Sequence, residues 1–119
     1  MWLIGELGLS HDHIPVGGKF GGLDAPEFLK MNPHGRIPCI LDEETVVWES
    51  HAILRYLAAQ YGCPMFWSND ARDRSQIDEW MDWLQTILQP DFLTGVFWGF
   101  YRTPESQRDW NAIQESIER

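Results

Sequence analysis

The stretch from Met31 to Ser50, MNPHGRIPCILDEETVVWES, constrains the fold more than any other part of this chain. A loop punctuated by proline and glycine leads into an apolar run at 36–41, and an acidic turn separates it from a β-branched run at 45–48. Two such runs joined by a short polar turn predict a β-hairpin. Pro38 stands at the start of the first run, although proline cannot donate to a β-ladder. We therefore expect the backbone there to do something other than pair with a neighbouring strand.

The rest of the chain predicts a mixed region followed by helices. Apolar spacing after Glu49 indicates an amphipathic helix that ends at Gly62, and a purely helical stripe follows Asp70 until Pro90, which should break or kink it. The expected elements are the end of a helix at 1–9, a strand at 12–16, a helix at 25–30 capped by Asp24, the hairpin, a helix at 50–61, a linker at 63–69, and helices from 70 onward that restart at Thr103.

Composition excludes several classes of protein. The 119 residues carry a net charge of −9 without a basic stripe, so neither nucleic acid nor an anionic membrane is an expected partner. No apolar run approaches the ~20 residues of a membrane span, and no signal peptide is recognisable. Cys39 and Cys63 lack the spacing of a zinc site, which predicts two reduced thiols, no metal and a cytoplasmic protein.

Glu49 and Ser50 stand where the second strand passes into a helix. The start of a helix offers free N–H groups and a positive dipole end, which together favour an anion. Ser50 can donate to a carboxylate, and Glu49 beside it can accept from an ammonium group. The pair therefore suits a group with both charges, such as the α-amino-acid head of a small peptide. The alternative is that Ser50 only caps the helix.

The residues around Pro38 offer a second set of ligand contacts. With a cis bond before Pro38, Ile37 would present its backbone N–H and C=O to an extended ligand, as in strand addition. His34 and Arg36 flank this point and could pair with a ligand carboxylate, although the residues alone favour ordinary surface side chains for both. Cys39 is expected to be a small buried residue, because no His or Lys is placed to lower the pKa of its thiol.

Two motifs in these stretches resemble a known family. NPHGRIP at 32–38 and WESHAILRYL at 48–57 closely resemble the glutathione transferase family, most of all its bacterial members near the theta, beta and nu classes. The resemblance covers the whole chain, including FWGFYRTP at 97–104. It implies an α/β thioredoxin-like N-terminal domain at 1–62 that lacks its first strand. It also implies a linker at 63–69 and the start of an all-α C-terminal domain at 70–119.

The resemblance also implies a glutathione site. The backbone of Ile37, before a cis Pro38, would pair with the cysteinyl unit of glutathione, and Glu49 and Ser50 would hold the γ-glutamyl head. The glycyl carboxylate would face one of three basic residues, His34, Arg36 or Lys19. Glutathione would be a co-substrate, and no metal is implied.

The match breaks at both ends of the chain. Family members begin earlier, and the part absent here would hold the first strand together with the Ser, Thr, Tyr or Cys that hydrogen-bonds the glutathione sulfur. No catalytic residue is therefore assigned. The start at Met1 and the stop at Arg119 both lack helix caps, which leads to the hypothesis that the chain is truncated.

Three functions follow from the resemblance. The intact parent protein would conjugate the glutathione thiol to a hydrophobic electrophile, as detoxifying enzymes of the family do, and would be a homodimer. The alternatives are a non-catalytic module that holds glutathione or a protein, and an inactive fragment. This chain itself is expected to show no turnover. Four aromatic residues are candidates for the electrophile pocket and equally for the core: Trp83, Phe97, Trp98 and Tyr101.

Overall fold

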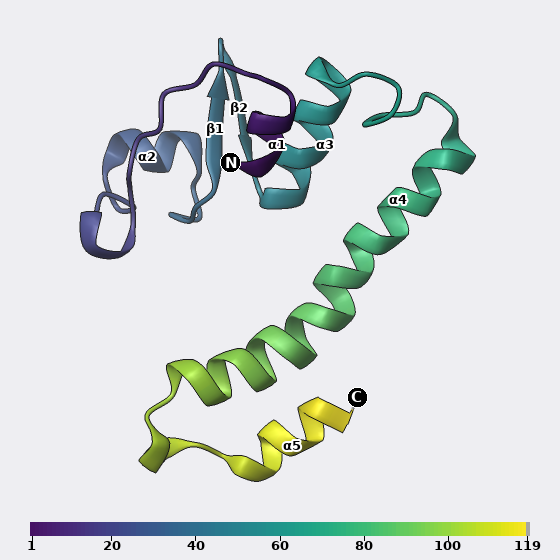
Figure 1. The fold of residues 1–119 in the computed structure, drawn as a ribbon. Helices are drawn as coiled ribbons and strands as arrows, with labels where there is room; N and C mark the ends of the chain where they lie inside the picture. Colours follow the sequence, from purple (N-terminus) through teal and green to yellow (C-terminus); the bar gives the residue numbers. More distant parts are fainter. Residues whose placement is uncertain (119) are drawn as a thin grey trace. The chain divides into compact units, whose positions relative to one another are not determined.

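The computed structural model describes residues 1–118 and divides the chain into two compact units. The first unit runs from Met1 to Asn69 and the second begins at Asp70. Each unit is described by itself below. The ribbon in Figure 1 shows the strands and the shorter helices in the first unit and the long helix in the second.

The first unit is built around the predicted hairpin. Strands β1 (Cys39–Asp42) and β2 (Thr45–Trp48) pair antiparallel, with Cys39 opposite Trp48 and Asp42 opposite Thr45. A two-residue turn joins them and holds Glu43 at a positive φ of 53°. The hairpin is thus confirmed, and its first strand begins one residue after Pro38. The helical elements of this unit are α1 (Trp2–Glu6), η1 (Gly18–Phe20), α2 (Pro26–Met31) and α3 (Ser50–Tyr61).

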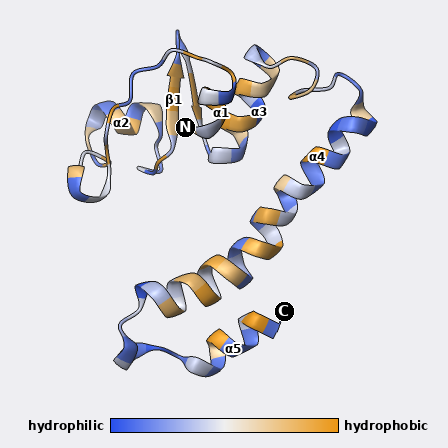
Figure 2. Cartoon of the chain, in the orientation of Figure 1, coloured by the Kyte–Doolittle hydropathy of each residue, from blue (hydrophilic) through white to orange (hydrophobic). Residues whose placement is uncertain are grey.

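The core of the first unit lies where α1 and the hairpin pack on α3. Its buried centre consists of Leu3, Ile53 and Leu57. Ile53 and Leu57 stand four residues apart on α3, so they share the apolar face that the sequence predicts. Figure 2 shows the hydrophobic colouring along β1 and α3. Partly buried apolar residues surround this centre: Ile4, Leu7, Leu9, Ile40, Val47, Leu54, Tyr56 and Phe66.

Two local predictions in this unit are wrong. Residues 12–16 form no strand, because a strand needs a ladder partner and the two strands of the described residues pair only with each other. Pro15, which has no N–H to donate, weakens that segment further. The second error is the cap of α2. Ala25, not Asp24, is the N-cap residue, and the helix then starts on Pro26.

The second unit is built of helical elements joined by short connections in its described part. Its elements are α4 (Ala71–Trp83), the π-helical segment η2 (Leu84–Arg102), η3 (Glu105–Gln107) and α5 (Trp110–Glu118). Of the two N-cap candidates that the sequence offers, Asn69 and Asp70, it is Asp70 that caps α4: its side chain accepts from the backbone N–H groups of Arg72 and Asp73 at 2.8 and 3.3 Å. Of the two predicted effects of Pro90, a break or a kink, the break does not occur. Pro90 lies inside η2, where the backbone hydrogen bonds on either side outweigh the one N–H that proline lacks.

Glycines allow α5 to approach η2 closely. A Cβ placed on Gly95 would collide with the side chain of Ser116, and one on Gly99 would lie 3.0 Å from Cγ1 of Ile113. Ile113 is the buried residue of α5, with 5% of its surface exposed. The two glycines stand four residues apart on η2, and α5 packs against the backbone at both of them.

Replacing Gly95 with alanine is therefore expected to destabilise the second unit. The new methyl group overpacks the η2–α5 contact, and overpacking of this kind costs about 1–3 kcal/mol. Gly5→Ala is the matched control, because a Cβ at Gly5 of α1 meets nothing within 4 Å. Gly5→Ala should stabilise its helix by about 1 kcal/mol. Urea unfolding followed by circular dichroism measures both changes, and an unchanged free energy of unfolding for Gly95→Ala would contradict the packing described.

Candidate functional site

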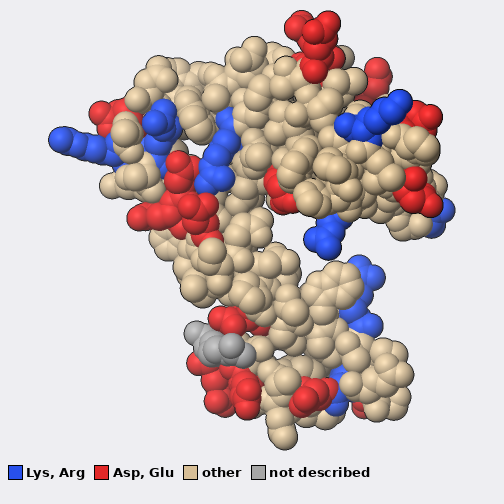
Figure 3. All heavy atoms as spheres, turned by 180° about the vertical axis from the view of Figure 1, so that it is seen from behind, with Lys and Arg blue, Asp and Glu red and all other residues tan. Residues whose placement is uncertain are grey.

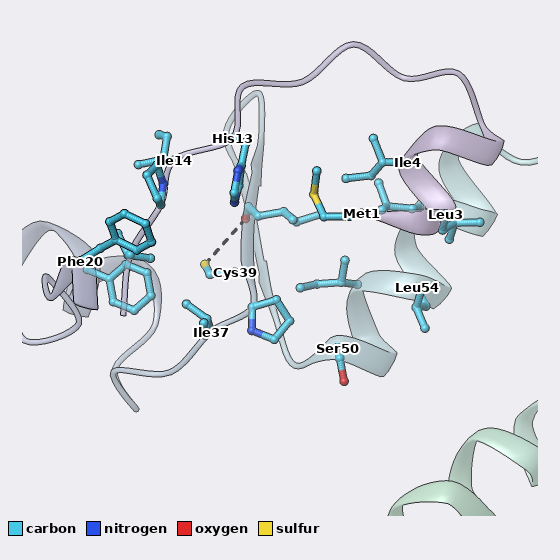
Figure 4. Close-up of a pocket in the computed structure, with 17 residues that line it drawn as sticks. Met1, Leu3, Ile4, His13, Ile14, Phe20, Ile37, Cys39, Ser50 and Leu54 are labelled. Carbon is cyan, nitrogen blue, oxygen red and sulfur yellow. Dashed lines mark hydrogen bonds between the residues drawn. The ribbon is translucent and has the colours of Figure 1, made fainter. Parts of the chain in front are cut away.

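A cavity of about 420 Å³ lies in the first unit, between the segment 13–16 and the hairpin. Most of its lining is apolar, and Figure 4 shows Ile14 and Phe20 on one side with Ile4, Leu3 and Leu54 on the other. Three of the predicted site residues line it: Ile37, Pro38 and Ser50. The cavity therefore brings together the loop before β1 and the start of α3, which the sequence places twelve residues apart.

The start of α3 is uncapped. Glu49 is the N-cap residue and its carbonyl accepts the first helical hydrogen bond, from the N–H of Ile53 at 2.9 Å. The side chain of Glu49 makes no capping hydrogen bond to the first turn of this helix. The alternative that Ser50 only caps the helix is therefore not what the structure contains. The positive end of a twelve-residue helix is open to an anion at this point.

Glu49 has a strained backbone. Its φ of 71° and ψ of 123° lie in a region that residues with a Cβ rarely adopt. Conformations of this kind cost about 1–3 kcal/mol and gather at binding and catalytic sites. Here the strain turns the chain sharply from β2 into α3, and the Glu49 side chain is exposed at the corner. Ser50 follows at once, and its hydroxyl points away from the apolar side chains in Figure 4.

The peptide bond between Ile37 and Pro38 is cis, as the resemblance to the family implies. Ile37 is 55% exposed, although it stands next to a strand and carries a large apolar side chain. Its exposure places it at the rim of the cavity, not in the core. Lys19 lies elsewhere, on the turn η1, where its ammonium group sits 5.1 Å from the ring centroid of Phe20.

Asn32 organises the loop that carries His34 and Arg36, and sequence analysis overlooked it. Its side-chain amide donates to the carbonyl of Arg36 at 2.7 Å, and its Oδ1 accepts from the backbone N–H of His34 at 3.1 Å. It is 2% exposed and is the one buried polar residue of the described chain. The signal was present in the sequence, since asparagine before proline is typical of a side-chain-bonded turn.

The two basic candidates of this loop are both exposed. The ring of His34 packs edge-on against Trp48 of β2, with centroids 5.1 Å apart. This contact holds His34 beside the end of the hairpin, near the start of α3. The backbone carbonyl of Arg36 accepts the hydrogen bond from the Asn32 side chain, and the Arg36 side chain is exposed.

A carboxylate clamp joins the hairpin to α3 away from the cavity. Asp42 accepts hydrogen bonds from the hydroxyl groups of Tyr56 and Tyr61, at 2.7 and 2.5 Å. These bonds, chiefly the one from Tyr61, hold the pKa of Asp42 below its ordinary value. The bond to Asp42 in turn raises the pKa of Tyr61 to about 12 and also raises that of Tyr56. The clamp fixes the orientation of α3 and hence of its first residue.

The clamp makes stability depend on pH at both extremes. Because the folded pKa of Asp42 is lowered, its contribution is present above its unfolded pKa of about 3.9 and is lost as the pH falls through the lower folded value. Because the pKa of Tyr61 is raised, its contribution is complete below about pH 10 and is lost as the pH rises through about 12. We expect Asp42→Asn to shift the late tyrosine ionisation, followed by phenolate absorbance, to lower pH. Glu43→Gln, which removes a neighbouring charge but no hydrogen bond, should change the titration little; equal shifts in both variants would contradict the clamp.

Neither a metal-binding cluster nor a membrane-spanning helix occurs among the described residues. They contain no group of three or more His, Cys, Asp or Glu side chains that could hold a metal ion. No helix among them is long and apolar enough to pass through a membrane.

Cys39 lines the cavity, and its thiol lies 3.9 Å from the carbonyl of Ile40. Burial raises the pKa of the Cys39 thiol, which disfavours the reactive thiolate. Figure 3 shows acidic side chains in several separate groups on one face of the molecule.

Comparison with known proteins agrees with this geometry. Residues 1–59 match the family model described as glutathione S-transferase, N-terminal domain. The chain is 41% identical over 113 residues to glutathione S-transferase GstB of Escherichia coli, an alignment that covers 93% of this chain and 54% of GstB. The chain belongs to the glutathione transferase family. It combines the thioredoxin-like N-terminal domain of that family with a helical C-terminal region, as the sequence predicts.

Solved structures extend the comparison. The theta-class glutathione S-transferase of Xanthomonas axonopodis pv. citri, with glutathione bound, matches with a TM-score of 0.87 and 41% identity over 98% of this chain and 56% of its own. Ure2p in complex with glutathione matches with a TM-score of 0.82 and 30% identity, over 98% of this chain and 50% of its own. The chain thus spans about half the length of the transferases that it resembles.

Proposed function

We propose that this chain carries the recognition part of a glutathione site, and that the protein to which it belongs conjugates the glutathione thiol to an electrophile. The observation that carries the proposal is the uncapped start of α3, where Ser50 lines a cavity that Ile37 also lines and Glu49 directly precedes Ser50. The glutathione bound to the Xanthomonas relative and to Ure2p supports the choice of ligand.

Each end of the tripeptide has a partner in this proposal. The γ-glutamyl carboxylate accepts from the Ser50 hydroxyl and the free N–H groups of α3, and its ammonium group donates to Glu49. The backbone of Ile37 pairs with the cysteinyl unit, and Pro38 keeps the loop in place. His34 or Arg36 faces the glycyl carboxylate, with Lys19 as a third candidate. Sulfur activation is assigned to no residue of this chain.

Calorimetry with glutathione tests the proposal directly. We expect binding that saturates at one ligand per chain, and no turnover when a general electrophile such as 1-chloro-2,4-dinitrobenzene is added. Turnover would show that a residue of this chain activates the sulfur. Absence of binding to the folded chain would overturn the recognition site. Binding without turnover would also fit a non-catalytic glutathione-binding module.

The transferase is further proposed to act in the cytoplasm as a homodimer. The support is the apolar stripe of α4, which the sequence predicts and which stays at the surface of the second unit. Ile77, Trp80 and Trp83 are 46%, 65% and 41% exposed, and the rings of Trp80 and Trp83 meet edge-on with centroids 5.7 Å apart. Analytical sedimentation of the chain tests the homodimer, and a chain that stays monomeric at all concentrations would contradict it.

A further inference from the structure

The loop at 17–22, GGKFGG, carries an exposed aromatic side chain at the edge of the cavity. Lys19 and Phe20 form its tip, within the turn η1, and a pair of glycines stands on each side of them. Phe20 lines the cavity, yet 60% of its surface is exposed. Figure 4 shows its ring near Ile14, on the opposite side of the cavity from Leu54. A large apolar side chain therefore borders an apolar cavity without filling it.

Hydrogen bonds within the loop make its tip a compact unit. The N–H of Gly17 donates to the carbonyl of Gly21 at 2.7 Å, and the N–H of Phe20 donates to the carbonyl of Gly17 at 3.0 Å. Gly17 and Gly22, at the two ends of the loop, both have a φ of 81°. Glycine moves between positive and negative φ at no steric cost, and hinges are a few residues that absorb such changes. The tip can therefore swing as one body about its ends.

The base of the loop packs against a residue of the proposed glutathione site. Gly17 is buried, and a Cβ placed on it would lie 3.3 Å from Cδ1 of Leu23 and 3.5 Å from Cδ1 of Ile37. Ile37 is the residue whose backbone pairs with the cysteinyl unit in the function proposed above. A ligand that fixes Ile37 therefore also acts on the base of the loop.

We propose that the loop at 17–22 is a lid that closes over the glutathione site when the ligand binds, and that Phe20 then moves from the edge of the cavity into it. This inference rests on the function proposed above. Burial of the exposed ring against the apolar lining favours the closed form, and the entropy of the glycine-rich loop favours the open one. Glutathione shifts this balance only if it binds the closed form more tightly. Closure would also shield the bound thiol from water.

Limited proteolysis of the full chain tests the lid. We expect trypsin to cut after Lys19 about tenfold more slowly at saturating glutathione, because cleavage follows the population of the open loop. Cleavage after the exposed Arg102 of the second unit is the internal reference, and it corrects for any effect of glutathione on trypsin itself. Mass spectrometry of the fragments measures both rates, and calorimetry on the same sample measures binding.

A variant at the tip separates closure of the lid from direct shielding of Lys19 by the ligand. Phe20→Ala should still bind glutathione but should lose most of the protection at Lys19, because the ring that seats the lid is gone. Phe20→Leu, which keeps an apolar side chain, should retain part of the protection. Leu41→Ala is the matched control, since Leu41 is 61% exposed on β1 and lies outside the lining of the cavity, and it should keep full protection.

Three results would overturn the lid. Binding of glutathione without protection at Lys19 would remove the lid and leave the proposed function standing. Equal protection in Phe20→Ala and the parent chain would show that the ligand itself shields Lys19. Absence of binding in calorimetry would remove the lid together with the glutathione site on which it rests.

Discussion

Replacing Glu49 with glutamine is expected to weaken glutathione binding by about tenfold or more. The proposed site has one carboxylate for the ligand ammonium group, and a hydrogen bond to a charged group contributes about 1.5–3 kcal/mol. That range corresponds to roughly a tenfold to hundredfold change in Kd. The variant keeps the size of the side chain, so the strained backbone at φ 71° is unchanged. Calorimetry with glutathione measures the effect.

A matched control and a second variant sharpen this prediction. Glu44→Gln makes the same charge change in the turn of the hairpin and should leave affinity within about twofold, because exposed charges at a distance are screened. Ser50→Ala should weaken binding by a comparable factor to Glu49→Gln by removing the donor to the ligand carboxylate. Equal affinities for Glu49→Gln and Glu44→Gln would place the ammonium group elsewhere.

Replacing Asn32 with alanine is expected to cause the largest loss of stability in the first unit. The change leaves the carbonyl of Arg36 and the N–H of His34 without their partner in a site where Asn32 is 2% exposed. Each of the two groups left unsatisfied costs about 1–3 kcal/mol, so the total loss is about 2–6 kcal/mol. Glutathione affinity should fall as well, because the loop that carries Ile37 loses its internal support. Urea unfolding and calorimetry on the same sample separate the two effects.

Asn111→Ala serves as the control for Asn32→Ala. Asn111 lies exposed on α5, and alanine there should change the free energy of unfolding by less than about 1 kcal/mol and leave glutathione affinity unchanged. An Asn32→Ala variant as stable as the parent would show that the two hydrogen bonds do not hold the loop. Asn32→Asp is a further test, since it keeps the acceptor for His34 but buries a charge without a donor for the Arg36 carbonyl.

The proposed glutathione site depends on backbone groups and on the start of α3, with Glu49 and Ser50 beside them. The hydrogen bonds of Asp42 with Tyr56 and Tyr61 lie outside this site, but they tie the hairpin to α3 and so help to orient the helix.

The sequence by itself determined the hairpin, the extent of α3 and the cap of α4. These features depend on residues close together in the chain: alternating runs around a polar turn, an apolar face ended by Gly62, and Asp70 before its own helix. It also pointed to Ile37, Pro38, Glu49 and Ser50 through two motifs whose spacing is specific to the family. Local hydrogen bonding and periodicity are sufficient for such features, so neighbours in sequence reveal them.

Only the tertiary structure decided the features that require partners distant in sequence. Residues 12–16 could not be resolved as strand or coil from their own composition, because a strand exists only with a ladder beside it. The joint lining of one cavity by Ile37 and Ser50, and the clamp from Asp42 to Tyr61, depend on how the hairpin packs on α3. The passage of the helix through Pro90 depends on a balance of hydrogen bonds along nineteen residues of η2. Contacts of this kind arise when segments distant in sequence pack together, and no local sequence pattern predicts them.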